Sequence, residues 1–385
     1  MNIVARIRAF VVREVVLVVA ILAALVSCVF VTPDVQYASY IDWRTLGLLF
    51  CLMVVVTGLR FLGVMRLFGE WVVSKARSKK VLAALLVGLT FGTSMVITND
   101  VALITFVPFA LVVMHAAEMK TEGAAVVVLM TIAANLGSML FPMGNPQNLF
   151  LFQASGLSFL EFVCLMLPYT VLSACLLIGA LLLLFRKTTE AKKTGIGSMK
   201  TPMLSRVEWL KTAVYGFLFA LCIGAVLDLV PLLWCLAIVL VIVLVMDASV
   251  LRRIDYGLLL TFVALFVFVG NMGRLSVVHD VVSWLVGLSP VLVAILSSQV
   301  ISNVPAAVLL SGFTDQWQAL IVGTNIGGLG SLIASMASVI SFKIATVGGL
   351  VSRKVYLWVF AQYNIAFLLV LLAAYVAINW LCGSG

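Results

Sequence analysis

The chain has 385 residues, of which 64% are apolar and only 10% are charged, and it carries a formal net charge of +9. Water-soluble chains carry about 45–50% apolar and about 25% charged residues, so this composition excludes a water-soluble fold. The apolar residues come in runs of roughly 17–25, long enough to cross a bilayer as helices, rather than in the alternating segments of a membrane β-barrel. The sequence therefore predicts an all-α polytopic membrane protein.

The positive charge does not indicate nucleic-acid binding, because no basic stretch is interleaved with aromatic residues and no recognition motif accompanies it. The seven cysteines lie scattered in apolar segments without a CxxC pair, so we interpret them as buried apolar side chains. We expect no cofactor and no metal other than a coupling Na⁺. The apolar run Val15–Val31 is longer than the core of a secretory signal and is predicted to be the first span.

Two apolar segments, at about 81–114 and 290–313, are predicted to enter and leave the membrane on one side. With that assignment nearly all Lys and Arg residues fall on a single face, which the positive-inside rule places in the cytoplasm. We expect a plasma-membrane (inner-membrane) protein with a cytoplasmic N-terminus and an external C-terminus. Re-entrant hairpins imply a cavity, since a backbone broken at membrane depth needs protein or water to satisfy its polar groups. The remaining spans are predicted at about 14–31, 43–65, 123–150, 162–185, 211–228, 232–247, 256–274, 319–350 and 357–381.

The sequence contains an internal repeat with three landmarks in the same order. The run that begins Ile41-Asp42-Trp43 aligns without gaps on the run that begins at Ile254. Further along, TND at 98–100 recurs as SNV at 302–304, and NLGSMLFPMGNPQN at 135–148 recurs as NIGGLGSLIASMAS at 325–338. The charge-based orientation places Asp42 outside and Asp255 inside, so the two halves are predicted to have opposite topology.

This repeat divides the chain into four segments. Residues 1–40 hold the N-terminal helix, and 41–185 form inverted repeat 1 with a hairpin at about 81–114 and a broken helix at about 123–150. Residues 186–253 provide a cytoplasmic linker and two connecting spans. Inverted repeat 2 covers 254–385, with a hairpin at about 290–313 and a broken helix at about 319–350. Inverted repeats whose broken helices meet near the bilayer midplane are typical of secondary transporters.

The hairpin tips carry polar residues that are unfavourable in lipid unless they bind something. Hydroxyl, amide and freed carbonyl oxygens suit a small hard cation such as Na⁺, while the N-termini of the half-helices that follow suit an anionic group. Glycines and polar residues at 135–148 and 325–338 mark where two spans break. Helix capping and kinking is the structural alternative for any one of these residues.

Asp100 is the only carboxylate expected at membrane depth, because the other acidic residues fall at span ends or in loops. An intramembrane ionisable group is a functional candidate by default. If desolvation dominates, Asp100 carries a proton, whereas if a bound Na⁺ dominates it stays ionised. The structural alternative is a cap on the outgoing arm of the hairpin. Lys343 either faces the cavity and attracts an anion or extends to the cytoplasmic surface.

At these residues the sequence resembles the ion transporter superfamily that includes divalent anion:sodium symporters, citrate transporters, arsenite permeases and a class of Na⁺/H⁺ antiporters. The resemblance runs from about residue 41 to the C-terminus. It lies in TND with its following proline (98–108), GNPQN (144–148), SNVPA (302–306) and GTNIGG (323–328).

The resemblance implies a homodimer with a scaffold subdomain and a transport subdomain that moves in an elevator-like cycle. It implies that substrate lies between the two tips, with binding groups from Thr98, Asn99, Asn145, Asn148, Ser302, Asn303, Ser335 and Ser338. Cation or proton coupling is assigned on the same basis, together with the depth of Asp100, to Asp100, Asn99, Asn135, Gly137, Asn303, Asn325 and Gly327.

Two residues depart from the family pattern, because members that transport carboxylates tend to have Ser-Asn-Thr at both tips. Here Asp100 stands in the first tip and Val304 in the second. The added negative charge disfavours a multiply charged carboxylate, since like charges in a low-dielectric site repel strongly unless neutralised. An aspartate at the first tip is more similar to the arsenite-permease side of the superfamily, and the substrate class stays open.

The leading hypothesis is a secondary active transporter that moves a small anion or oxyanion, either a di- or tricarboxylate or an inorganic oxyanion, across the plasma membrane. Transport would be coupled to Na⁺ or H⁺, as in symport, by an elevator-like mechanism. The alternative is Na⁺/H⁺ antiport with Asp100 as the exchanging group. An intramembrane enzyme would need a nucleophile with a base, paired acids or a metal cluster at depth, and the sequence predicts none of these. Membrane lipid, the small anion and the coupling ion are the expected partners.

Overall fold

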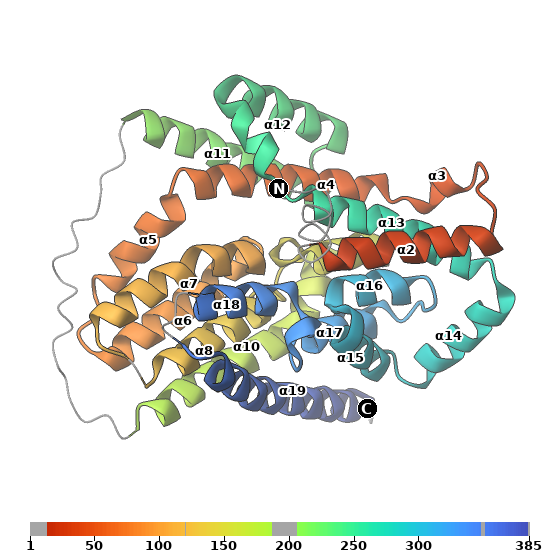
Figure 1. The fold of residues 1–385 in the computed structure, drawn as a ribbon. Helices are drawn as coiled ribbons and strands as arrows, with labels where there is room; N and C mark the ends of the chain where they lie inside the picture. The colour runs from red at the N-terminus through yellow and green to blue at the C-terminus, as the bar shows by residue number, and fades with distance from the viewer. Residues whose placement is uncertain (1–13, 120, 187–205, 348–350, 384–385) are drawn as a thin grey trace, which may run out of the picture.

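The computed structural model describes residues 14–119, 121–186, 206–347 and 351–383, and in these ranges the regular structure is helical (Figure 1). The first half contains α2 (Val15–Phe30), α3 (Tyr37–Tyr40), α4 (Trp43–Phe61), α5 (Val64–Val73), α6 (Lys79–Val96), α7 (Asn99–Ala116), α8 (Gly123–Gly137), η1 (Pro142–Gly144), α9 (Pro146–Ser155) and α10 (Phe159–Leu184). The remainder contains α11 (Arg206–Val226), α12 (Leu232–Asp247), η3 (Ala248–Arg253), α13 (Tyr256–Gly273), α14 (Ser276–Leu288), α15 (Pro290–Ile301), α16 (Asn303–Ser311), α17 (Trp317–Gly327), η4 (Leu332–Ala334), α18 (Met336–Val347) and α19 (Arg353–Gly383).

Within the described ranges, eight helices are long and apolar enough to cross a membrane. A ninth crossing results if α14 and α15, which are bent by 112° at their junction, are counted as one. The prediction of an all-α polytopic membrane protein is confirmed. The basic residues at 6–13 and most of the linker at 186–210 lie outside the described residues.

Two halves of the chain contain the same elements in the same order. A long helix (α4 or α13) leads to a short helix (α5 or α14), a helical hairpin (α6–α7 or α15–α16), a broken helix (α8–η1–α9 or α17–η4–α18) and a final long helix (α10 or α19). The first helix of each half begins with the same cap, since Asp42 accepts from Thr45 N at 3.0 Å and Asp255 accepts from Leu258 N at 3.1 Å. Figure 1 shows α4 running towards α5 at one end of the molecule and α13 running towards α14 at the other.

The two hairpins differ in the length of their arms. Helices α6 and α7 have 18 residues each, about 27 Å at 1.5 Å per residue, so each arm is long enough to cross the hydrocarbon core. Helices α15 and α16 have 12 and 9 residues, about 18 and about 14 Å, and are too short to cross. Re-entry of the first hairpin therefore stays a prediction from charge.

A glycine at a matched position lets each broken helix pack closely on the first arm of its own hairpin. A Cβ on Gly137 of α8 would overlap the backbone oxygen of Phe91 in α6, and a Cβ on Gly327 of α17 would lie 2.7 Å from Ser298 Oγ in α15. Small residues at helix interfaces allow this approach in membranes, where packing rather than hydrophobic driving force holds helices together. The sequence predicts backbone flexibility or cation binding for these glycines, whereas their environment indicates close packing.

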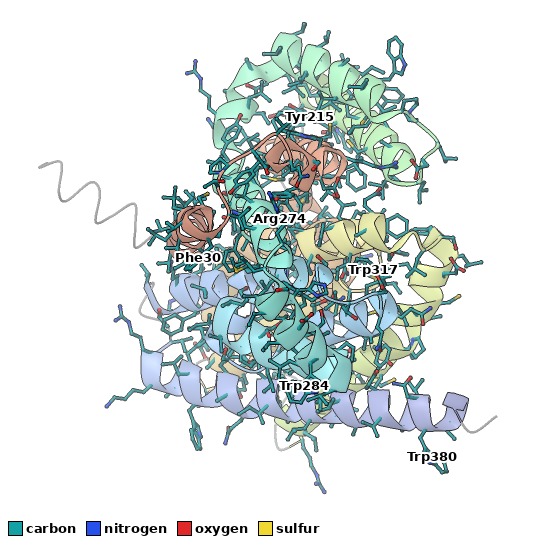
Figure 2. The ribbon with its side chains drawn as sticks, turned by 90° about the vertical axis from the view of Figure 1, so that its right-hand side faces the viewer. Phe30, Tyr215, Arg274, Trp284, Trp317 and Trp380 are labelled. Carbon is teal, nitrogen blue, oxygen red and sulfur yellow. The ribbon has the colours of Figure 1, made fainter. Side chains whose placement is uncertain are left out.

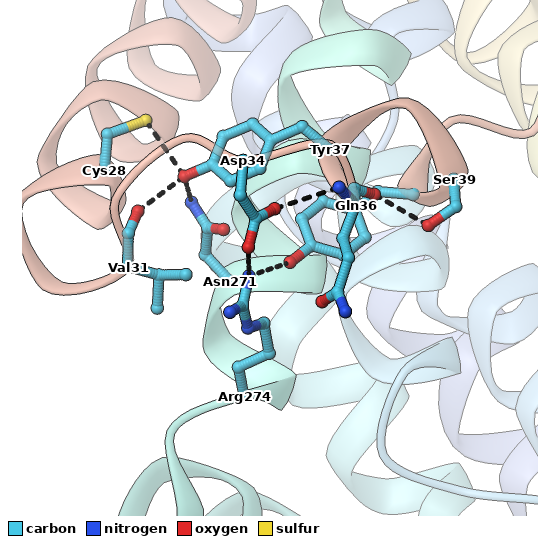
Figure 3. A network of polar contacts seen from close by, with 9 residues as sticks. Cys28, Val31, Asp34, Gln36, Tyr37, Ser39, Asn271 and Arg274 are labelled. Carbon is cyan, nitrogen blue, oxygen red and sulfur yellow. Dashed lines mark hydrogen bonds and ion pairs between the residues drawn. The ribbon is translucent and has the colours of Figure 1, made fainter.

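A polar cluster ties the N-terminal helix to the second half (Figure 3). The Tyr37 hydroxyl donates to Val31 O at 2.6 Å and accepts from Asn271 Nδ2 at 2.8 Å. Beside it, the Arg274 guanidinium pairs with Asp34 at 2.8 Å. Helix α2 packs along α13 beneath this cluster, so the segment before the first repeat is anchored to the first helix of the second repeat.

Aromatic side chains mark the end of the molecule that carries α14, which faces the viewer in Figure 2. Trp284 of α14 is 64% exposed and Trp380 of α19 is 72% exposed. Tryptophan is enriched where a membrane meets water, so these side chains are consistent with this end of the molecule lying at one of the two membrane surfaces.

We expect Gly137→Ala to lower the stability of the folded protein, because a methyl group would collide with main-chain atoms that cannot rotate away. Overpacking of this kind costs about 1–3 kcal/mol. The effect is measured as the melting temperature in detergent, taken from the loss of the monodisperse size-exclusion peak after heating. Gly88→Ala in α6 is the matched control, since a Cβ there meets nothing within 4 Å; equal melting temperatures for the two variants would contradict the packing role.

Candidate functional site

The first hairpin tip lies between α6 and α7, where Ile97 and Thr98 are extended and α7 restarts at Asn99. Asn99 is 5% exposed; its Oδ1 accepts from Asp100 N at 2.9 Å and its Nδ2 donates to Asn135 Oδ1 at 3.1 Å. This amide therefore closes the tip and joins it to the end of α8. Asp100 follows in the first turn of α7, where a negative charge is favoured by the helix dipole.

The second hairpin tip has a strained backbone. Ser302, between α15 and α16, has φ 74° and ψ 154°, a conformation that is largely restricted to glycine. Its hydroxyl donates to Ala334 O at 3.4 Å in the break of the second broken helix. Strained residues of this kind cluster at functional sites, and the adjoining Asn303 is 5% exposed.

The break of each broken helix is hydrogen-bonded to the other half, and the two sets of bonds are reciprocal. From the first half, Asn135 Oδ1 accepts from Ser335 Oγ at 2.9 Å, and Asn135 Nδ2 donates to Ser338 Oγ at 3.4 Å. Ser335 directly precedes α18, and Ser338 lies in its first turn. The bonds satisfy buried polar groups that lipid could not satisfy.

The second half makes the mirrored contacts through Asn325, the repeat counterpart of Asn135. Asn325 Nδ2 donates to Asn148 Oδ1 at 2.6 Å, and Asn325 Oδ1 accepts from Asn145 Nδ2 at 3.4 Å. Asn145 and Asn148 occupy the positions that Ser335 and Ser338 occupy in the other half. We call these six residues the crossed amide network.

A cavity of about 260 Å³ lies beside this network, between the two hairpin tips. Five of the expected site residues line it: Asn99, Asp100, Ser302, Asn303 and Ser335. The tip residues at one side of the cavity are buried, whereas Asp255 and Lys343 on its wall are exposed. The cavity thus reaches from exposed charged groups to the buried tips.

The remaining expected residues do not line this cavity. Asn145, Asn148, Ser338, Asn135 and Asn325 are buried in the crossed amide network. Thr98 is half-buried at the first tip, and its side chain makes no capping hydrogen bond. Gly137 and Gly327 pack against the hairpin arms as described above. Their assigned roles in binding and coupling stay predictions.

Asp100 is distinguished by an unpaired oxygen. Its Oδ1 atom is buried and has no hydrogen-bond partner in the structure. A buried carboxylate oxygen without a donor is costly, so it favours binding of a proton or a cation. The structural-cap alternative does not account for this oxygen, because a capping carboxylate would accept a hydrogen bond from a backbone N–H group.

Two acidic residues that the sequence places at span ends line the same cavity as Asp100. They are Glu14, before α2, and Asp255, before α13. The point where a Cβ would stand on Gly257 is 2.8 Å from Glu14 Oε2 and 3.0 Å from Asp255 Oδ1, so the absent side chain makes room for both. Asp255 also lies near enough to Asp100 for their charges to interact. The only sequence signal was that Asp255 repeats Asp42 at the start of a helix.

Two helical hairpins and two broken helices that meet around a cavity with polar tip residues on its wall are typical of a membrane carrier. The chain belongs to the citrate transporter family, CitMHS, whose family model matches residues 5–316. The resemblance to the ion transporter superfamily is thereby confirmed, and the protein is a membrane transporter of the citrate transporter and arsenite permease type.

Curated proteins are similar to this chain, two of those named here over most of their length and one over part of it. The uncharacterized transporter MJ0456 of Methanocaldococcus jannaschii is 31% identical over 88% of this chain and 91% of its own. The inner membrane protein YbiR of Escherichia coli is 31% identical over 87% of both chains. The silicon efflux transporter LSI3 of Oryza sativa is 34% identical over 39% of this chain and 30% of its own.

We expect Ser302→Gly to be more stable than Ser302→Ala, because both lose the hydroxyl but only glycine relieves the strained backbone. The strain at such a residue is about 1–3 kcal/mol, part of which the greater freedom of glycine in the unfolded chain offsets. The difference in melting temperature between the two variants measures it. If alanine proves as stable as glycine, Ser302 is not strained.

Asn325→Ala is expected to destabilise the folded protein by about 1–3 kcal/mol, because it leaves the buried Asn148 Oδ1 without its hydrogen-bond donor and removes one bond of Asn145 Nδ2. Thr324→Val is the control, since the Thr324 hydroxyl bonds only to carbonyls of its own helix. Thermal unfolding in detergent compares the two. A loss for Thr324→Val as large as for Asn325→Ala would argue against a special role of the crossed amide network.

Proposed function

We propose that this chain is a secondary active transporter that moves a small anion or oxyanion across the plasma membrane, coupled to Na⁺ or H⁺ through Asp100. The observation that carries the proposal is the buried, unpartnered Asp100 Oδ1 on the wall of a cavity between two hairpin tips. An ionisable group in this position gains a partner when a cation or proton arrives. Binding of the coupling ion at Asp100 would then favour binding of the cargo in the same cavity.

The charges around the cavity bear on the cargo. Among the described lining residues, Glu14, Asp100 and Asp255 contribute three carboxylates, against the single ammonium of Lys343. A multiply charged carboxylate would be repelled in this setting unless several cations entered with it. A singly charged oxyanion, or the neutral weak acid from which it forms, fits better, and the relative named for silicon efflux supports an inorganic cargo.

The tips supply the groups that such a cargo needs. Asn99, Ser302, Asn303 and Ser335 present amide and hydroxyl groups that donate to and accept from an oxyacid. The N-termini of α7 and α16 begin at the same tips, and their free N–H groups favour negative charge. Asn99 and Asn303 would also hold a coupling Na⁺ with nearby backbone carbonyls.

Na⁺/H⁺ antiport without a separate cargo is the second candidate function. It is favoured by the same excess of carboxylates, which suits alternating occupation by Na⁺ and H⁺. Counterflow of a labelled oxyanion in proteoliposomes is expected for the first function, and Na⁺-induced proton release without any anion for the second.

The cycle that we propose is elevator-like. The hairpins and broken helices would move as one body, because the crossed amide network joins them across the halves. Helix α4 with the paired α2 and α13 would form the static part and, by family resemblance, the dimer interface. The N-terminus would be cytoplasmic and the C-terminus external.

We expect Asp100→Asn to abolish the dependence of uptake on the Na⁺ or H⁺ gradient, because the amide cannot exchange a proton or neutralise a bound cation. Its melting temperature is expected to stay close to wild type, since the lost oxygen makes no hydrogen bond. Uptake of labelled arsenite or phosphate into proteoliposomes, with imposed gradients of either ion, provides the measurement.

The control is Asp280→Asn in α14, which changes an exposed carboxylate beside His279 that does not line the cavity. It is expected to transport as wild type does. Unchanged cation dependence in Asp100→Asn would refute the coupling role.

A further inference from the structure

Among the described residues, Lys343 is the one positive side chain on the wall of the cavity that contains Asp100. It projects from α18, the helix that follows the break of the second broken helix, and α18 packs against α7, which begins at the first tip. Figure 1 shows α18 lying over α7. Lys343 and Asp100 thus come from different halves of the repeat but from neighbouring helices.

The ionisable groups that face this cavity come from four helices or their caps. They are Glu14 before α2, Asp100 on α7, Asp255 before α13 and Lys343 on α18. Among the described residues, Lys343 forms no ion pair within 4.0 Å. Its ammonium therefore shares a cavity with acceptors to which it is not yet bound.

Asp100 and Asp255 line one cavity and their negative charges interact, so a nearby positive charge stabilises the pair. When Na⁺ or H⁺ occupies the site, that charge is supplied from solution. When the site is empty, the lysine is the available source, because its flexible four-carbon stem lets the ammonium reach groups at some distance.

We propose that the Lys343 ammonium is an internal counter-cation that competes with the coupling cation for the Asp100 and Asp255 carboxylates, and so sets the affinity of the cavity for Na⁺ or H⁺. This inference rests on the proposed coupling role of Asp100. It assigns Asp255 to the same site, as the carboxylate that shares the cation with Asp100.

The competition has a consequence for the transport cycle. An unloaded cavity in which Asp100 and Asp255 are both ionised would be costly to carry through a membrane. Neutralisation by Lys343 lowers that cost, so the empty carrier can return without a bound cation. Lys343 then raises the cation concentration needed for loading and speeds the return of the empty carrier.

Two other roles make different predictions. As an anchor for the cargo, Lys343 would raise affinity for an anion and leave cation affinity unaffected. As a side chain that only extends to the membrane surface, it would affect neither. Removal of a competitor, by contrast, increases cation affinity.

The test compares wild type, Lys343→Met, Lys343→Gln, Lys343→Arg and Asp255→Asn as purified full-length proteins. The Na⁺ concentration that gives half of the maximal rise in melting temperature is measured in choline chloride of constant ionic strength, without any anionic cargo, and the titration is repeated against pH. A ligand that binds only the folded state raises its apparent stability, so the curves report affinity. Lys354→Met, an exposed lysine on α19 away from the cavity, is the control.

Lys343→Met and Lys343→Gln are expected to lower the half-saturating Na⁺ or H⁺ concentration about 10-fold, which corresponds to about 1.4 kcal/mol. Lys343→Arg and Lys354→Met should resemble wild type, and Asp255→Asn should raise the half-saturating concentration. The proposal is overturned if Lys343→Met and Lys343→Gln both have the cation titration curves of wild type. It is also overturned if these variants lose the rise in melting temperature caused by arsenite or phosphate while their cation affinity stays unchanged. If Asp100→Asn still abolishes the cation response, only the role of Lys343 has failed; if Asp100→Asn responds like wild type, the proposed function itself has failed.

Discussion

Helices that break inside a membrane leave amide and carbonyl groups that lipid cannot satisfy, and this constraint governs the whole centre of the protein. Amide side chains bond the freed carbonyls, since Asn148 Nδ2 donates to Ser138 O and Met139 O, and Asn135 Nδ2 donates to Gly328 O of the other half. The crossed amide network then joins these side chains to each other across the two halves. Because each half supplies the partners of the other, neither broken helix is satisfied alone. The two halves are thereby held together at the place where the hairpin tips approach each other.

The same arrangement separates structural from reactive polar groups. Amides in the crossed amide network have partners within the protein, whereas Asp100 Oδ1 has none. The cavity beside it carries three carboxylates and one lysine, so its occupancy depends on small charges that can enter and leave. In the function that we propose, such a site would couple cargo to a cation through charge balance rather than through a specific shape.

The sequence predicted the bounds of the helical hairpins and of the broken helices to within a few residues, because polar interruptions in apolar runs are conspicuous and the repeat supplied a second copy of each. It also singled out Asp100 as a carboxylate at the first tip. It predicted less well which of those polar residues face the cavity. Asn145, Asn148 and Ser338 share the composition of a binding site, yet they are buried against the opposite repeat. Glu14 and Asp255 were interpreted as ordinary span ends, since nothing local to either residue indicates that Gly257 brings the two carboxylates together.

Length, apolar composition and the position of basic residues by themselves determined that the chain is helical, crosses a membrane many times and repeats its own plan. These properties follow from transfer free energies and helix length, which each segment obeys independently of its neighbours. Only the tertiary structure decided which amides pair with each other and which charges share a cavity. Such contacts join residues about 200 positions apart, and their partners are set by how helices pack rather than by any local pattern.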